Sequence, residues 1–366
     1  MAKDRVVVAM SGGVDSSVAA ALLVEQGYEV IGLFMRTGAS DEETAAPSCD
    51  DQPKKIRGCC SAIDAGDAQR VADRLDVPFY ALNFKDDFDR IKDYFVDEYS
   101  QGRTPNPCVV CNSWLKFGKL WEYAEAVGAN QIATGHYARV VPGENGPELH
   151  RAVDTSKDQS YFLFGLRQEI LRGVRFPLGD LTKPEVREIA RKLELGVHTK
   201  PESQEICFVP SGDYKEFIAG HRPDALGTPG EIVDQDGQSL GTHQGLSRYT
   251  IGQRKGLGIA VGEPRYVLEI DPQQNQLVIG PEQLLQRREF QVERVNWLIS
   301  EVPQAPLVCD VKIRYLHRPA TATIRALPDG CASVCYDEPQ SAITPGQAAV
   351  FYQGDRLVGG GWIADR

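Results

Sequence analysis

The residues best suited to chemistry near the start of the chain form a short turn of small and polar side chains. The turn reads Ser11-Gly12-Gly13-Val14-Asp15-Ser16-Ser17; it follows the apolar run 5–10 and precedes the Ala/Leu/Val-rich stretch 18–25. Glycines let the backbone turn tightly and present its N–H groups, and the N-terminus of a following helix adds partial positive charge. The pattern therefore predicts a phosphate site, with an ordinary glycine turn that binds nothing as the alternative.

This turn differs from the common P-loop because the Lys-Ser/Thr ending of that motif is missing. A Ser-Gly-Gly-x-Asp-Ser turn between a strand and a helix resembles instead the loop of the ATP pyrophosphatases. The resemblance implies that the β and γ phosphates of ATP leave as pyrophosphate and that AMP is transferred to an oxygen of the substrate. It also implies that Asp15 helps to position a magnesium ion (Mg2+), which offsets the charge of the pyrophosphate.

Three cysteines offer a nucleophile that could act after such an adenylation. Cys108 and Cys111 stand at C-x-x-C spacing just before a predicted helix, whose dipole lowers the pKa of a thiol, and Cys207 lies further along the chain. The alternatives are a structural zinc half-site or a redox dithiol for the pair, and simple packing for Cys207. No second C-x-x-C completes a zinc site.

The elements that must position these groups alternate between strands and helices in the first part of the chain. This alternation predicts an α/β fold, a doubly wound parallel sheet with helices on both faces. The acidic insertion 37–56 is predicted to be a loop, and Cys49, Cys59 and Cys60 in or beside it are interpreted as incidental thiols. Strands are predicted at 30–35, 79–84 and 131–134, and helices at 67–75, 88–99 and 114–126.

The pattern changes after residue 142. Helices are predicted at 169–172 and 184–193, and from residue 227 the signals are short strands and turns, with a hairpin turn at Asp236-Gly237. The segments 311–315 and 321–325 alternate as half-buried strands do. We therefore predict three domains: an ATP-binding catalytic domain (1–208, helical from about 150), a small β-rich central domain (209–282) and a C-terminal β-barrel (283–366).

Charge and hydropathy restrict the location and the partners of the protein. The formal net charge of −11 argues, for the chain as a whole, against a nucleic-acid partner, but residues 283–366 carry equal numbers of acidic and basic side chains. Two stretches without acids, 242–262 and 311–328, have the composition of phosphate-contacting patches, with a solvated basic face as the alternative. Nine cysteines are too few for a disulfide scaffold. With neither an apolar run of the ~20 residues that cross a membrane nor a secretory leader pattern, we expect a cytoplasmic protein.

Taken together, the motifs resemble those of the bacterial tRNA-specific 2-thiouridylases, in order along essentially the whole chain. The resemblance implies an enzyme that replaces the C2 oxygen of the wobble uridine in tRNA by sulfur, consuming ATP. It implies as partners the anticodon arm of tRNA and a sulfur donor such as a cysteine desulfurase or a sulfur-relay protein, with no membrane. The motifs are the turn at 11–17, GLFM at 32–35, GRTPNP at 102–107, ATGHY at 133–137, KDQSYF at 157–162, ICF at 206–208, GQRKGLG at 252–258 and TPGQ at 344–347.

The same resemblance assigns roles to individual positions. ATP would be bound by Ala9, Met10, Ser11, Gly12, Gly13, Val14, Asp15, Ser16, Met35 and Gly135. The target base would meet Asn106, Pro107 and Cys108, and the rest of the tRNA would be contacted by His136, Lys157, Asp158, Gln159, Arg314, Tyr315 and Gln347. Arg314 and Tyr315 fall inside the second stretch without acids, which favours the phosphate-contact interpretation. For His136 the alternative is a hydrogen-bonded histidine near the end of a strand.

The resemblance to the thiouridylases implies one route for the sulfur, and the cysteines of this chain suggest a second. In the persulfide route, Cys207 carries sulfur as a persulfide, its terminal sulfur attacks the adenylated C2, and Cys111 resolves the intermediate as a Cys111–Cys207 disulfide. Familiar members of the family have aspartate where this sequence has Cys108, so Cys108, Cys111 and Cys207 would also suit a 4Fe-4S cluster with one open iron site. We take the persulfide route as the prediction and the cluster as its alternative.

Two other functions share part of this pattern. A ligase that adenylates a small substrate needs the glycine turn but neither Cys111 nor Cys207, and an RNA-binding protein could use ATP only as a conformational ligand. Nucleoside analysis of tRNA after reaction with ATP and a sulfur donor separates them from the thiolating enzyme.

Overall fold

The computed structural model describes residues 4–38, 62–202, 206–209, 212–259 and 262–365. The predicted loop at 37–56 lies outside these residues except for its first two positions, and so do Cys49, Cys59 and Cys60. The chain forms two compact units. The first contains Met1–Ile91, Cys108–Gly212 and Asp355–Leu357, and the second contains Lys92–Pro107, Asp213–Gly354 and Val358–Arg366.

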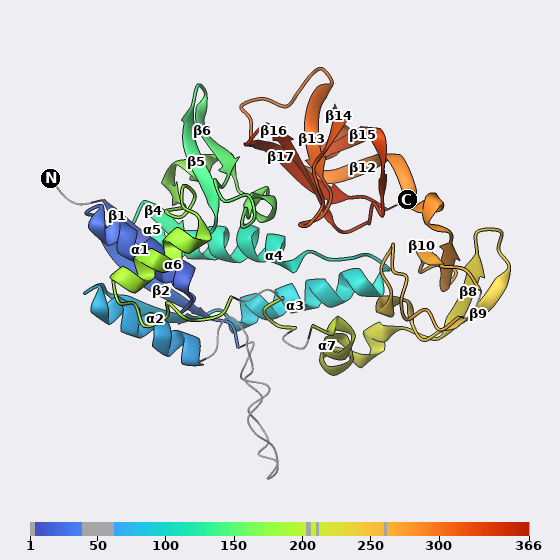
Figure 1. Cartoon of the computed structure of the whole chain (residues 1–366), viewed down its shortest axis with the longest axis horizontal. Coiled ribbons are helices and arrows are strands. Elements are labelled where there is room, and N and C mark those ends of the chain that lie inside the picture. The colour runs from blue at the N-terminus through green and yellow to red at the C-terminus, as the bar shows by residue number, and fades with distance from the viewer. Residues whose placement is uncertain (1–3, 39–61, 203–205, 210–211, 260–261, 366) are drawn as a thin grey trace, which may run out of the picture. The chain divides into compact units, whose positions relative to one another are not determined.

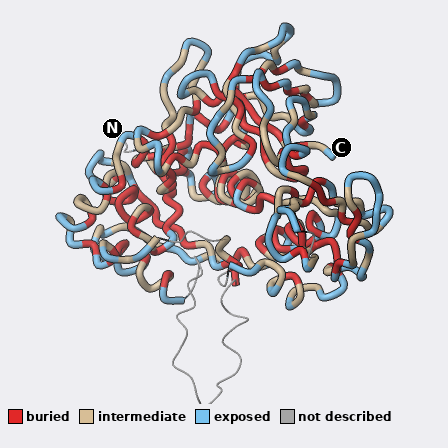
Figure 2. Tube along the Cα trace, turned by 45° about the vertical axis from the view of Figure 1, so that its right-hand side comes forward, coloured by how far each residue is buried: buried red, intermediate tan, exposed pale blue. Residues whose placement is uncertain are grey.

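The first unit is built on a five-stranded parallel sheet with the order β3-β2-β1-β4-β7. Two of its inner strands are short and almost completely buried, as expected for strands covered on both faces: residues 6–9 of β1 and all four residues of β4 are buried. Figure 2 colours the trace by burial and shows buried segments in the interior with exposed ones around them. The strands are β1 (Arg5–Ala9), β2 (Glu29–Arg36), β3 (Phe79–Asn83), β4 (Gln131–Thr134) and β7 (Val174–Arg175).

Helices cover this sheet on both faces (Figure 1). α1, α2 and α6 share one apolar core with the sheet. The chain moves across the sheet in one direction from β1 to β3 and returns in the other direction from β3 to β4. Because such crossovers are right-handed, the returning connection places α5 on the other face. The predicted doubly wound parallel sheet is confirmed. The helices are α1 (Val14–Glu25), α2 (Ala62–Arg74), α3 (Lys85–Ser100), α4 (Pro107–Val110), the π-helix η1 (Cys111–Lys119), α5 (Leu120–Ala126), the 3-10 helices η2 (Ser160–Leu163) and η3 (Gln168–Gly173), and α6 (Lys183–Lys192). A hairpin of β5 (Ala138–Gly143) and β6 (Gly146–Arg151) follows β4.

The second unit holds the β-rich part of the chain. A four-stranded sheet has the order β10-β11-β8-β9, and a six-stranded barrel with the order β12-β15-β14-β13-β16-β17 is closed by pairing of β12 with β17. The strands are β8 (Gly230–Asp234), β9 (Ser239–His243), β10 (Tyr266–Asp271), β11 (Gln276–Gly280), β12 (Gln286–Trp297), β13 (Leu307–Lys312), β14 (Ala320–Leu327), β15 (Cys331–Ser341), β16 (Ala348–Gln353) and β17 (Arg356–Ile363). The helices are α7 (Tyr214–His221), η4 (Pro223–Leu226), η5 (Leu246–Arg248), η6 (Glu282–Leu285) and η7 (Pro328–Gly330). The predicted C-terminal β-barrel is confirmed.

Two predicted elements differ in detail from the structure. The strand predicted at 311–315 is wrong by several positions: β13 ends at Lys312, because the N–H of His317 donates to the Arg314 carbonyl (3.0 Å) and closes a turn there. The helix predicted at 169–172 is a 3-10 helix. The hairpin turn at Asp236-Gly237 is confirmed between β8 and β9, where Gly237 has a φ of +84°.

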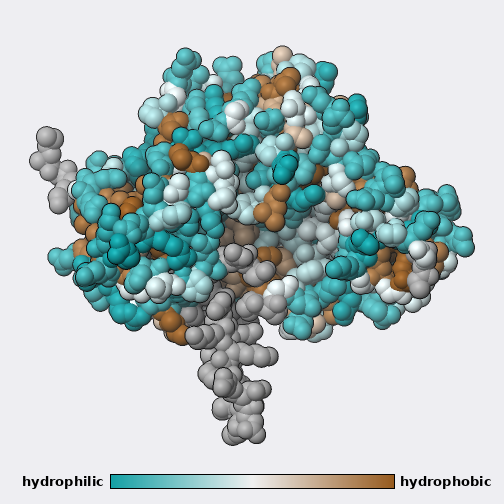
Figure 3. Space-filling model, viewed as in Figure 1, coloured by the Kyte–Doolittle hydropathy of each residue, from teal (hydrophilic) through white to brown (hydrophobic). Residues whose placement is uncertain are grey.

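The face of the molecule in Figure 3 is covered mainly by hydrophilic residues, with apolar ones scattered among them. In the part of the chain that the structure describes, no helix has the length and apolar character that crossing a membrane requires.

Candidate active site

The glycine turn joins β1 to α1 and is closed by its own serines. The N–H of Ser11 donates to Ser16 Oγ (3.0 Å), and the Ser16 hydroxyl donates to the Gly13 carbonyl (3.3 Å). Gly12 has a φ of +72°, and a Cβ atom there would lie 2.1 Å from the backbone oxygen of Asp64. Because any side chain would collide with the first turn of α2, only glycine fits at this position.

The N-terminus of α1 is open toward the turn. Its N-cap is Gly13, which offers no side chain to bind the first backbone N–H groups of the helix, so these groups are suited to an anion. Gly135, directly after β4, packs against the same place: a Cβ there would lie 2.7 Å from the Asp15 carbonyl carbon and from the Ser16 nitrogen. After β1 the chain continues to β2 on one side of the sheet, and after the neighbouring β4 it continues to β7 on the other side. Parallel sheets bind ligands at the point where the strand order reverses in this way, and the glycine turn lies there.

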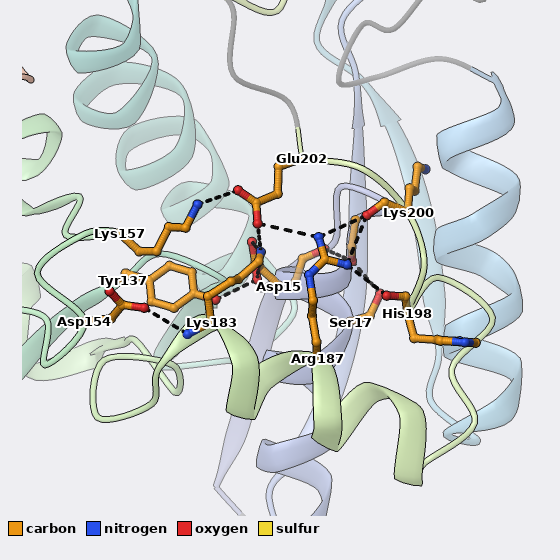
Figure 4. Close-up of polar contacts among 12 residues, drawn as sticks. Asp15, Ser17, Tyr137, Asp154, Lys157, Lys183, Arg187, His198, Lys200 and Glu202 are labelled. Atoms are coloured by element: carbon orange, nitrogen blue, oxygen red, sulfur yellow. Dashed lines mark hydrogen bonds and ion pairs between the residues drawn. The ribbon is translucent and has the colours of Figure 1, made fainter.

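A charged network surrounds the side chain of Asp15 (Figure 4). The ammonium group of Lys183 lies 2.8 Å from both carboxylate oxygens of Asp15, and the Tyr137 hydroxyl donates to Oδ1 (2.9 Å). The same ammonium group lies 3.3 Å from Glu202, whose other oxygen accepts from Lys157 (2.6 Å). A lysine charge therefore stands beside the open helix N-terminus, although the turn itself contains none.

Lys183 was not predicted from the sequence as a site residue. It is the first residue of α6, whose N-cap Thr182 forms a capping box with Glu185, and the backbone N–H of Lys183 donates to Asp154 (2.9 Å). The lysine side chain is only 10% exposed, so its ammonium group is held in place. The available signal was the sequence Thr182-Lys183-Pro184-Glu185, a capping-box pattern that fixes a lysine at the start of a helix.

The environment shifts the pKa of two residues beside Lys183, Tyr137 and Glu202. Burial, together with the nearby charge of Asp15, raises the pKa of Tyr137, so its hydroxyl stays protonated and donates. Burial opposes the charged form of Glu202, but the hydrogen bond from Lys157 and the charge of Lys183 outweigh it, and the pKa of Glu202 is lowered. Beside Lys183, Tyr137 is thus a neutral hydrogen-bond donor and Glu202 is an ionised acceptor.

The three candidate thiols all belong to the first unit. Cys108 is exposed in α4, Cys111 is half-buried and begins the π-helix η1, and Cys207 is half-buried in the described segment 206–209. Segments of π-helix are rare and occur often at functional sites. Among the residues that the structure describes, which include Cys108, Cys111 and Cys207, no three His, Cys, Asp or Glu side chains come together as a metal site.

Comparison with known proteins places this geometry in a family. Family models described as a tRNA methyl transferase HUP domain, a tRNA methyl transferase PRC-barrel domain and an aminomethyltransferase beta-barrel domain match residues 4–211, 215–281 and 287–363. Curated relatives named tRNA-specific 2-thiouridylase MnmA are 50% identical in Magnetococcus marinus (98% of this chain, 98% of the relative) and 47% identical in Rhodopirellula baltica (98% and 96%). This chain belongs to the tRNA-specific 2-thiouridylase family. The predicted family is confirmed, and with it the prediction of an enzyme.

The relatives carry a thiouridylase name although two of the matching family models are described as tRNA methyl transferase domains. A solved 4-thiouridine synthetase–RNA complex with bound ATP covers 61% of this chain and 51% of its own at 15% identity, with a TM-score of 0.36. That score is too low to carry an argument about function.

The positions that the thiouridylase resemblance assigns to ATP lie at one edge of the sheet. Ala9 ends β1, and Met10 continues it by donating its N–H to the Leu33 carbonyl (2.8 Å). Met35 is half-buried near the carboxyl end of the neighbouring β2, and Gly135 follows β4. Parallel strands end at a common edge, so these residues and the glycine turn lie together there.

The structure places His136 in the interior. Its Nδ1 lies 2.7 Å from the Thr134 hydroxyl and its Nε2 lies 3.5 Å from the Lys116 ammonium group. Burial, and next the charge of Lys116, lowers the pKa of His136 well below the ordinary value, so the imidazole is neutral. This arrangement favours the alternative interpretation, a hydrogen-bonded histidine near a strand end.

Two of the three neighbouring RNA candidates support local structure. Asp158 is buried and accepts hydrogen bonds from the N–H of Ala152 (3.2 Å) and from the Ser160 hydroxyl (3.0 Å). Gln159 accepts from the N–H of Tyr137 (3.0 Å) through its side-chain oxygen. Lys157, by contrast, is part of the charged network through Glu202.

The remaining candidates lie in the second unit. Gln347 donates to the carbonyls of Thr104 (3.1 Å) and Pro105 (3.0 Å), so it supports the segment that contains buried Asn106 and Pro107. Arg314 donates to the Ser341 carbonyl (3.3 Å), and the Tyr315 ring lies 5.3 Å from the Lys312 ammonium group. A cavity of about 380 Å³ is lined by Thr104, Arg314 and Gln347 among others. The structure thus brings Arg314 and Gln347 to one cavity.

Proposed function

We propose that this protein thiolates tRNA at the expense of ATP, by adenylating the C2 oxygen of the wobble uridine and replacing that oxygen with sulfur. The observation that carries the proposal is the juxtaposition of the open α1 N-terminus with the Asp15–Lys183 pair, two groups of opposite charge at one phosphate-binding turn. Membership of the thiouridylase family gives the substrate class, since the curated relatives are named for tRNA.

The turn is suited to hold the β and γ phosphates of ATP through backbone N–H groups, while Lys183 supplies the cation that the turn lacks. Asp15 fits as a magnesium ligand, because its carboxylate is one-third exposed and carboxylate oxygens are what Mg2+ prefers. Bound there, magnesium would supply charge neutralisation for the departing pyrophosphate. The residues themselves orient the α-phosphate and stabilise the leaving group, so that AMP is transferred to the uridine oxygen.

For the sulfur step we propose the persulfide route. The terminal sulfur of a Cys207 persulfide attacks the adenylated C2, AMP leaves, and a disulfide links Cys207 to the base. The Cys111 thiolate then attacks the Cys207 sulfur, which releases the 2-thiouridine and forms a Cys111–Cys207 disulfide. A sulfur donor such as a cysteine desulfurase or a sulfur-relay protein would load Cys207, and an external dithiol must reduce the disulfide before the next turnover.

The test combines ATP, unmodified tRNA, a persulfide donor and a dithiol reductant, followed by nucleoside analysis. We expect 2-thiouridine, lost in Cys207→Ser and in Asp15→Asn but retained in Cys331→Ser, a matched control because Cys331 is equally half-buried. Pyrophosphate release that does not depend on tRNA would refute the proposal in favour of a small-substrate ligase. Anaerobically purified protein whose activity follows its iron content would refute the persulfide route in favour of a 4Fe-4S cluster on Cys108, Cys111 and Cys207.

A further inference from the structure

We infer that Lys200 is a positioning residue that holds the glycine turn in its phosphate-binding shape and cancels the negative charge behind it. The inference rests on the proposed function, because it assigns a role in binding the ATP phosphates. Lys200 comes from the segment after α6 and reaches a turn that lies 188 positions earlier in the chain. No motif in the sequence singled it out.

The ammonium group of Lys200 is fully matched by acceptors. Its Nζ lies 2.9 Å from the Gly12 carbonyl oxygen, 2.5 Å from an Asp64 carboxylate oxygen and 2.6 Å from an Asp67 carboxylate oxygen. An ammonium group has three N–H donors, so each acceptor receives one. Burial works against the charged form, but the two carboxylates outweigh it and raise the pKa of Lys200. The charge therefore persists through the neutral pH range.

The bond to Gly12 fixes the orientation of one peptide group in the turn. In a planar trans peptide the C=O and the following N–H point in opposite directions. Because Lys200 draws the Gly12 carbonyl toward α2, the N–H of Gly13 points away from α2. Gly12 is left-handed and its Cα lies against the Asp64 backbone, so the turn has a second contact on the same side. The shape of the turn is thus set from behind, by α2 and Lys200 together.

The two carboxylates make this charge necessary. The side chains of Asp64 and Asp67 are only 12% and 18% exposed, so water screens them poorly. Both are within hydrogen-bond distance of a lysine that also touches the turn, and without that lysine they would repel a triphosphate bound there. Lys200 thus neutralises the repulsion between the two carboxylates and bound ATP, and it also orients the peptide group between Gly12 and Gly13.

Lys200 is itself held in place from α6. Arg187 of α6 donates to the His198 carbonyl (2.9 Å) and to the Lys200 carbonyl (3.4 Å), and the N–H of Lys200 donates to the Val197 carbonyl (2.9 Å). Figure 4 shows these side chains beside the Asp15 network. Because the backbone of Lys200 is already held, little further conformational entropy is lost when its side chain binds the turn.

The test compares Lys200→Gln with wild type and with Lys192→Gln, whose lysine is 68% exposed on the outer part of α6. Steady-state pyrophosphate release with unmodified tRNA gives KM for ATP and kcat; tRNA affinity and the unfolding temperature are measured beside them. We expect Lys200→Gln to raise the KM for ATP at least tenfold, with less than a threefold change in kcat and in tRNA affinity, and Lys192→Gln to match wild type. Adding Asp64→Asn and Asp67→Asn to Lys200→Gln should lower KM again, but not to the wild-type value, because the bond to Gly12 is still missing.

An unchanged KM for ATP in folded Lys200→Gln would overturn the inference, and so would a parallel loss of ATP affinity, tRNA affinity and thermal stability, which indicates a structural role only. If Lys200→Gln does not fold, Lys200→Arg tests the inference instead, because a planar guanidinium cannot direct three donors at these acceptors. A KM for ATP raised at least threefold in Lys200→Arg supports the inference, and an unchanged KM overturns it. A wild type that binds no ATP would overturn the proposed function and this inference with it, whereas wild-type binding with an unaffected Lys200→Gln overturns the inference alone.

Discussion

Replacing Lys183 by glutamine removes the only cation that the structure places on the Asp15 carboxylate among the residues it describes. Both Asp15 oxygens lie 2.8 Å from the ammonium group, and Glu202 lies 3.3 Å from it. Charge-assisted hydrogen bonds contribute about 1.5–3 kcal/mol each, but the Asp15 side chain is 33% exposed, so water recovers part of this. We expect a loss of roughly 1–2 kcal/mol in the free energy of unfolding.

The same substitution should weaken ATP use at least as much as it weakens the fold. A unit charge about 4 Å from a phosphate oxygen contributes about 4 kcal/mol at an effective dielectric constant of about 20. Solvent at this partly open site reduces that figure to about 2 kcal/mol, which corresponds to a roughly 30-fold loss in kcat/KM for ATP. The loss of stability and the loss in kcat/KM have the same origin, the removal of the Lys183 charge beside Asp15.

The assay is pyrophosphate release with unmodified tRNA over a range of ATP concentrations, with thermal unfolding measured on the same samples. Lys183→Arg should retain part of the activity because it keeps the charge, and Lys192→Gln should behave as wild type. At roughly 2–4 °C per kcal/mol for a unit of this size, the unfolding temperature of Lys183→Gln should fall by about 2–8 °C. A folded Lys183→Gln protein with wild-type kcat/KM for ATP would refute the assignment of the phosphate site to this network.

Three further outcomes follow from other parts of the structure. Gly12→Ala should lower the free energy of unfolding by roughly 3 kcal/mol and abolish ATP binding, because its Cβ would lie 2.1 Å from a backbone oxygen. Gly27 has a similar positive φ but open space around it, so Gly27→Ala should lower the free energy of unfolding by only about 1 kcal/mol. Denaturant unfolding of the two variants measures this difference. Because the pKa of buried His136 is lowered, the unfolded state binds more protons than the folded state below pH about 6.5. The free energy of unfolding should therefore fall by up to ~1.4 kcal/mol per pH unit as the pH drops below that value. His136→Asn should reduce this slope, which is measured by unfolding at several pH values. Gln347→Ala removes two bonds to the carbonyls of residues 104 and 105 and should weaken tRNA binding several-fold in a filter-binding assay while leaving the KM for ATP unchanged; an equal change in both would contradict its separate role.

The local elements of the fold were predictable because each is specified by neighbouring residues. The buried β-branched run before the glycine turn predicted β1, and the strand predicted at 131–134 coincides with β4. The alternation around residue 311 predicted a strand but not its end, since that end depends on the turn bond between His317 and Arg314. A helix was predicted from residue 114 with Cys108 and Cys111 before it, which is wrong: helical structure begins at Pro107 and includes both cysteines. The π-helical form from Cys111 was not predicted, because hydrogen-bond spacing leaves no clear mark in the sequence.

The sequence by itself determined the glycine turn between strand and helix, the parallel sheet, the C-terminal barrel and the family, because these depend on residue types at short or fixed spacing. Only the tertiary structure decided which charges meet at the turn. Lys183 and Lys200 are separated from Asp15 and Gly12 by 168 and 188 positions, so no local pattern could connect them. It also decided that His136 is a buried neutral ring, because the protonation state of an imidazole depends on the groups that surround it in space.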